Sequence, residues 1–257
     1  MSFKIGPNEG KTTDFSLESR RGNVSDVTKV STIGHANDVG SANETIQPGT
    51  GTIAPDALIA TPATVTVSST SANDTSAGTG ARTLLLSGLD ASGDTQSETI
   101  TMNGQTAVTS ANTYKWIQSM VVLTAGTTGS NEGDLYAGTG TVTAGKPAVL
   151  LCSGEIGANI SATSAYMVPN GHIFHPTQVS IIFSDSTKQV TADIYIRNAT
   201  TGLYLKVLEI NAPAGYWIQP VDAFGGQPSG TIIEIRASIV SGTTSLTSAI
   251  AGYLETV

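Results

Sequence analysis

The sequence has few charged side chains. Asp, Glu, Lys and Arg make up 12% of its 257 residues, about half the proportion in an average globular protein. Hydroxyl and amide groups must therefore cover much of the surface, and these groups lose little solvation when a neighbouring subunit packs against them. The formal net charge of -8 is also of the wrong sign for a nucleic-acid binder, which needs a basic footprint. The composition therefore favours protein partners and predicts no nucleic-acid partner.

Cysteine, histidine and long apolar runs are also scarce. Cys152 is the only cysteine, so an intrachain disulfide is excluded, and its apolar neighbours predict a buried, unreactive thiol. His172 and His175 would point to opposite faces of a strand, so we predict no metal site there. No segment approaches the length of a membrane span, and no apolar signal segment follows the N-terminus. These absences predict a protein made in the cytoplasm that does not bind a membrane.

Catalytic motifs are missing as well. The sequence contains no Gly-x-Ser-x-Gly elbow, no phosphate-binding P-loop and no dinucleotide fingerprint followed by a helix. A pair of acids for glycoside hydrolysis would come from distant strands and leaves no local signal. The acids in the second half of the chain are expected on solvated strand faces or edges: Asp185, Asp193, Glu209, Asp222 and Glu234. We therefore predict no catalytic residue and no cofactor, and a protein that is not an enzyme.

Two features leave alternatives open. The loops SANDTSAG, GLDASGDTQ and GSNEGD carry oxygen ligands suited to a calcium ion, but Asx residues also stabilise ordinary turns. Among the few aromatic residues, Trp116, Tyr216 and Trp217 are candidates for contacts with a partner or a glycan. The alternative is that one aromatic of each neighbouring pair packs in the core.

The pattern along the chain predicts an all-β fold in three parts. Residues 1–62 are polar and broken by Gly and Pro, which is typical of an extended N-terminal arm that becomes ordered on a partner. Residues 63–147 and 148–257 alternate between apolar and polar side chains, with turn residues at short intervals, as expected for two β-sandwich or jelly-roll-like domains. No window shows a capped helix face.

Individual strands can also be placed. Residues Arg82–Leu86 and Ser97–Met102 are predicted to form a hairpin or adjacent strands around a Gly- and Asp-rich connection. Val190, Ala192, Ile194 and Ile196 alternate with polar residues, as in a half-buried strand. The Asn198–Gly202 segment is predicted to be the turn of a second hairpin.

A known family shares the most unusual part of the sequence. Over about residues 33–145, four segments occur in a fixed order: SANDTSAGTGARTL, GLD, SETITMNG and TAGTTGSN. A block with these segments in this order is found in virion structural proteins of tailed bacteriophages, which this chain resembles. The remaining residues show only a generic sandwich pattern.

The resemblance implies a particle component without catalytic residues. We expect a capsid decoration or cement protein, a homotrimer on the virion surface that is made in the host bacterial cytoplasm and binds the major capsid protein or other virion proteins. The alternative is a tail, head-fibre or baseplate protein that binds host-surface glycans. A polysaccharide depolymerase ranks third.

Overall fold

The computed structural model describes residues 18–19, 21, 24–48, 53, 58–183, 185, 187–213, 215–220 and 225–257. These residues form an all-β fold of seventeen strands, with helical backbone only at Glu18 and Ser19. No helix in this part of the chain is long and apolar enough to cross a bilayer. The predicted all-β class is therefore confirmed.

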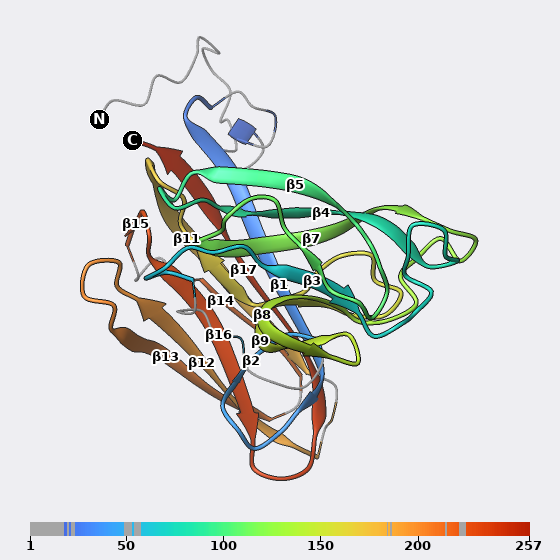
Figure 1. The fold of residues 1–257 in the computed structure, drawn as a ribbon. Coiled ribbons are helices and arrows are strands. Elements are labelled where there is room, and N and C mark those ends of the chain that lie inside the picture. Colours follow the sequence, from blue (N-terminus) through green and yellow to red (C-terminus); the bar gives the residue numbers. More distant parts are fainter. Residues whose placement is uncertain are drawn as a thin grey trace.

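The strands form four antiparallel sheets (Figure 1). Sheet A has the order β1 (Val27–Val39), β17 (Thr244–Thr256), β11 (His172–Phe183) and β14 (Gly215–Pro220), with β15 (Gln227–Pro228) also paired to β11. Sheet B has the order β10 (Ala165–Met167), β16 (Ile232–Ile239), β12 (Gln189–Arg197) and β13 (Tyr204–Pro213), with β2 (Glu44–Thr45) also paired to β16. Sheet C has the order β6 (Val108–Thr109), β3 (Thr66–Ser69), β8 (Leu135–Thr143) and β9 (Lys146–Gly154). Sheet D has the order β5 (Thr95–Thr101), β4 (Ala81–Leu89) and β7 (Trp116–Ala125).

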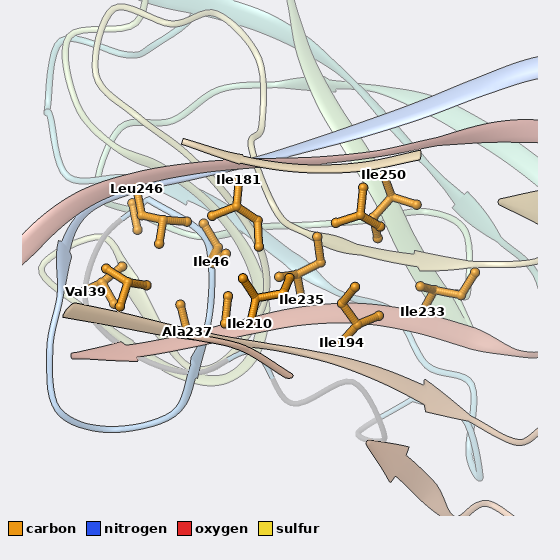
Figure 2. Close-up of a cluster of buried hydrophobic side chains, with 14 of the residues drawn as sticks. Val39, Ile46, Ile181, Ile194, Ile210, Ile233, Ile235, Ala237, Leu246 and Ile250 are labelled. Atoms are coloured by element: carbon orange, nitrogen blue, oxygen red, sulfur yellow. The ribbon is translucent and has the colours of Figure 1, made fainter. Parts of the chain in front are cut away.

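Sheets A and B share one hydrophobic core, and we call them body AB. Alternate residues of their strands point into a common layer of isoleucine, valine and leucine side chains (Figure 2). On β12 the buried set includes Ile194, while on β17 it includes Leu246 and Ile250. This is the period of two that the sequence shows in residues 190–196.

Sheets C and D enclose a second core, and we call them body CD. Its buried side chains come from β3, β4, β5, β7, β8 and β9 and include Val67, Leu84, Leu86 and Met120. The predicted hairpin is present here, because β4 and β5 pair with Leu86 opposite Glu98. A small third cluster joins the bodies: Leu89 and Trp116 of body CD pack with Ala165, Met167 and Ile232 of body AB.

Body CD is inserted into body AB. The chain leaves body AB after β2 and returns at β10, and both strands pair with β16. Residues 27–39, which the sequence places within an extended arm, instead form β1 and pair with β17 over its length. Most of the predicted arm before residue 27 lies outside the described residues.

The sequence signal of β1 is weak for a physical reason. Its core-facing positions include Gly34 and Ala36, so few large apolar residues mark the buried face. Gly34 is small because the backbone passes close to a neighbouring segment: a Cβ there would lie 2.5 Å from Ser164 Cβ and 2.6 Å from Ile46 O. A close approach of this kind cannot be read from periodicity.

The predicted boundary between residues 147 and 148 falls inside β9. The Ala144–Gly145 turn has positive φ angles of 48° and 82° and joins β8 to β9 in a hairpin rather than ending a domain. The apolar run after it supplies Leu151 and Cys152 to the core of body CD. Residues 146–154 therefore belong to body CD.

Candidate functional site

Trp116 does not reach the surface. It is 4% exposed and belongs to the cluster that joins the two bodies. Its indole N–H donates to Gln118 Oε1, and Gln118 Nε2 donates to the carbonyl of Met167 at 3.2 Å. The prediction of a glycan contact at Trp116 is therefore wrong, because its ring is used to hold the bodies together.

Tyr216 and Trp217 lie on β14, and their side chains lie outside the described part of the structure. Their backbone register is defined: Tyr216 is opposite Ile182 and Trp217 is opposite Ile181 on β11. Their predicted role in partner or glycan binding stays a prediction.

The histidines take part in separate local contacts. His172 Nδ1 lies 2.7 Å from the carbonyl of Asn170, while His175 Nε2 lies 2.9 Å from Glu255 Oε2. His35 Nδ1 lies 2.7 Å from Thr247 Oγ1. Within the described ranges, no group of three or more His, Cys, Asp or Glu residues is arranged to hold a metal ion.

Two acids expected on a solvated face of sheet B are buried. Glu234 is fully buried, accepts from Thr45 Oγ1 and pairs with Arg236 Nη2 at 2.8 Å. Asp193 is 4% exposed and accepts from Asn43 Nδ2 at 2.9 Å. Expecting both on solvated positions was therefore incorrect, since polar partners from the segment around β2 cover them.

Aromatic rings complete this cover. The Arg236 guanidinium lies 4.7 Å from the ring centroid of Tyr195 and 5.2 Å from that of Tyr204. Each such contact contributes about 0.5–2 kcal/mol, depending on desolvation. The arrangement neutralises and shields the Glu234 carboxylate, which indicates a structural ion pair.

Cys152 is buried and unpaired with another cysteine, as predicted. Burial raises the pKa of its thiol, and this effect exceeds the opposing hydrogen bonds from Ser161 and Thr163. A thiol held in its protonated form is a poor nucleophile.

Two of the loops that suggested a calcium site, SANDTSAG and GSNEGD, meet at one carboxylate. Asp74 is fully buried. It accepts four hydrogen bonds, from Ser69 Oγ at 2.5 Å and from the backbone N–H groups of Ala81 at 2.6 Å, Glu132 at 2.9 Å and Gly133 at 3.0 Å. These donors use both carboxylate oxygens, so Asp74 ties together the segments before β4 and before β8. We call this arrangement the Asp74 knot.

Neighbouring contacts tighten the Asp74 knot. Glu132 accepts from Thr79 Oγ1 and, at 2.7 Å, from Asn73 Nδ2. These bonds, the one from Thr79 first, hold the pKa of the Glu132 carboxyl below its ordinary value. At Gly78 a Cβ would lie 1.9 Å from the carbonyl oxygen of Asn73. The polar, glycine-rich character of this segment therefore follows from how closely its loops pack.

The outward face of sheet A carries no Asp, Glu, Lys or Arg side chain over its centre. Its one titratable residue is His35, whose Nε2 lies 3.6 Å from Glu155 Oε2. The three central rows of this face span β1, β17 and β11, with each residue opposite its neighbour in the next strand. The nine residues are Ser31, Ala251 and Gln178; Ile33, Ala249 and Ser180; and His35, Thr247 and Ile182. Ile33 is 53% exposed and Ile182 is 46% exposed. We call these nine residues the sheet A face.

A second apolar surface lies on the edge strand β13. Leu203, Leu205 and Val207 are exposed there or just before it. An exposed apolar edge strand is prone to pair with another chain. Two surfaces of body AB thus have the character of protein contacts.

A cavity lies between the two bodies. Its volume is about 250 Å³, and its lining comes from both bodies, with Leu89 and Lys115 on one side and Val168 and Arg197 on the other. Lys115 and Arg197 are 82 positions apart, so no local pattern in the sequence could have paired them.

Comparisons with known proteins add little. No protein-family model and no curated protein matches the sequence. Among solved structures, infectious bursal disease virus Gx strain matches with a TM-score of 0.20 at 12% identity, over 90% of this chain and 70% of that chain. The T13 particle of the same virus gives 0.17 at 10% identity over 89% and 77%, and its VP2 subviral particle gives 0.18 at 11% identity over 90% and 76%. TM-scores this low carry no argument about fold or function, and the resemblance to tailed-phage proteins stays a prediction from the sequence.

Proposed function

We propose that this chain is a non-enzymatic structural protein of a tailed-bacteriophage virion, most specifically a capsid decoration or cement protein. In this role it is made in the host bacterial cytoplasm, assembles as a homotrimer and binds the major capsid protein at the particle surface. The observation that carries the proposal is the sheet A face, a partly apolar surface without Asp, Glu, Lys or Arg on a chain with a net charge of -8.

Electrostatics favours this face for contact between copies. Acidic chains repel one another wherever their carboxylates come close. The sheet A face contains none of the 20 acidic residues of the chain, and the Glu155 carboxylate beside it contacts His35 at 3.6 Å. Like-charged copies can therefore meet there with little repulsion between carboxylates. Ile33 and Ile182 supply the apolar area that such a contact would remove from water.

The strand order within body AB supports the same role. We infer that bodies AB and CD are two β-sandwich domains and that body AB is a jelly roll. The two four-strand orders of body AB are β1-β17-β11-β14 and β10-β16-β12-β13, which match the two facing sheets of that architecture. Jelly rolls occur in viral capsid proteins and also in lectins, so this inference agrees with a particle protein without selecting the head over the tail.

The test is co-sedimentation with DNA-free capsids of the phage that carries this protein. We expect saturable binding by the wild type, and light scattering of the free protein is expected to give the mass of three chains. The Ile182→Lys variant places a charge on the sheet A face, opposite Thr247. Because an unpaired buried charge is costly, we expect the oligomer to dissociate and capsid binding to weaken by about a hundredfold, close to 3 kcal/mol.

The matched control is Val240→Lys. Val240 is 78% exposed and lies in the turn between β16 and β17, outside the sheet A face. We expect this variant to behave as the wild type. No capsid binding by the wild type, or equal effects of the two lysine variants, would contradict the proposal.

A further inference from the structure

The cavity between the bodies has the chemistry of a binding site for a small acidic sugar. We infer that it binds a carboxylated monosaccharide, such as a uronic acid, with the carboxylate held by Lys115 and Arg197. This inference does not rest on the proposed decoration role, because the same site would serve a head or a tail protein and its test uses the purified chain alone.

The charge in the cavity is the first argument. Lys115 is partly buried and lines the cavity. In the part of the chain that the structure describes, its ammonium has no carboxylate within 4 Å, because none of the ion pairs there includes it. An ammonium without a carboxylate beside it attracts an anionic ligand. Lys115 therefore favours an anionic ligand in the cavity.

Arg197 supplies the second cation, from β12 on the other side of the cavity. A guanidinium has five N–H donors in a planar fork that matches a carboxylate with two parallel hydrogen bonds. Five donors also allow it to bind a ligand while it keeps a contact within the protein. Two basic residues from different bodies thus line one small volume.

The remaining lining suits a sugar ring better than a bare inorganic anion. Ile59 is a partly buried and Ala199 an exposed apolar residue of the cavity lining, and they offer a surface for the C–H face of a ring. Ser92 and Asn170 add a hydroxyl and an amide that suit sugar hydroxyl groups. The volume of about 250 Å³ lies just below the range of about 300–1,000 Å³ for drug-sized ligands, which limits the ligand to one ring.

Backbone and side-chain hydrogen bonds hold the two sides of the cavity in place. Asn170 N donates to Gly93 O at 2.8 Å, and Asn170 Nδ2 donates to Asp94 Oδ1 at 3.1 Å, so the bodies are tied together beside the cavity. Lys115 N donates to Leu89 O at 2.8 Å. A site that is already held in shape loses little entropy on binding.

The experiment is a titration of the purified chain with sodium D-glucuronate, followed by the amide NMR signals of Gly93 and Gly230. Glucose serves as the neutral sugar and inorganic phosphate as the anion without a ring. We expect saturable millimolar binding of glucuronate, with shifts confined to the cavity. Glucose and phosphate are expected to bind at least tenfold more weakly.

Two variants and one control locate the site. Lys115→Gln removes one cation, and we expect glucuronate binding at least tenfold weaker. Arg197→Lys keeps the charge but loses the planar fork, and a threefold to tenfold loss is expected; it also tests the site if Lys115→Gln fails to fold. Lys188→Gln is the control, because Lys188 is also partly buried and contacts Ser241 O.

Three results would overturn the inference. They are the absence of saturable glucuronate binding, binding of glucose or phosphate as tight as that of glucuronate, and unchanged binding in folded Lys115→Gln or Arg197→Lys.

Discussion

Removing the Asp74 carboxylate is expected to destabilise body CD strongly. Asp74→Ala leaves three backbone N–H groups and the Ser69 hydroxyl without their acceptor. A hydrogen bond to a charged group contributes about 1.5–3 kcal/mol, but four bonds to one group do not add independently. A buried donor that is left without an acceptor costs about 1–3 kcal/mol, so we expect a total loss of about 4 kcal/mol.

Asp74→Asn gives a finer test of the same geometry. Oδ1 accepts from the N–H groups of Ala81 and Glu132, while Oδ2 accepts from Ser69 Oγ and Gly133 N–H. If the amide oxygen replaces Oδ1, only the Gly133 N–H loses its acceptor, because the Ser69 hydroxyl can rotate and accept from the amide. We therefore expect about half the cost of the alanine variant, close to 2 kcal/mol.

Denaturant unfolding measures both variants in a Trp217→Phe background, so that the fluorescence of Trp116 alone reports on body CD. The control is Asp90→Asn, in the turn between β4 and β5, where the carboxylate accepts from the N–H groups of Ser92 and Asp94 at an exposed site. We expect a change within about 0.5 kcal/mol for this surface substitution. A loss below about 1 kcal/mol for Asp74→Ala would refute the account of the Asp74 knot, since a single hydrogen bond contributes that much.

The remaining predictions concern two buried titratable groups. Burial raises the pKa of Tyr166 to about 12 from 10.0, so the unfolded chain loses this proton first and the free energy of unfolding falls as the pH rises from 10 to 12. At pH 11 Tyr166 alone lowers the free energy of unfolding by about 1.4 kcal/mol. Urea unfolding at pH 8 and pH 11 is therefore expected to show a smaller fall in stability for Tyr166→Phe than for the wild type. An equal fall in the two proteins would contradict this prediction. Burial also raises the thiol pKa of Cys152. A thiol reagent is therefore expected to label the denatured chain fully and to leave the native chain unlabelled. Rapid labelling of the native chain would contradict the burial of Cys152.

Sequence patterns predicted the strands that have two clearly different faces. The hairpins β4–β5 and β12–β13 carry alternating residues and Gly-rich turns, and both form as predicted. β1 was missed because Gly34 and Ala36 occupy its buried face. The insertion of body CD was missed because the pairing of β2 and β10 with β16 joins residues that are far apart in the chain.

Sites were harder to predict than strands. Trp116 is a residue type that often contacts glycans, but whether its ring is exposed depends on how the two bodies pack. Asp74 lies in a loop that the sequence marks as either a turn or a cation site, and only the positions of its four donors decide between them. Lys115 and Arg197 line one cavity through the same packing of the bodies, for which no pattern within either segment gives a signal.

The position of this chain on a particle is the most direct test of the assembly role. Cryo-electron microscopy of DNA-free capsids saturated with the protein is expected to show it on the outside of the shell, in groups of three, with Ile33 and Ile182 buried against neighbouring copies. Capsids without this density, or a bound protein whose sheet A face is open to solvent, would contradict the account.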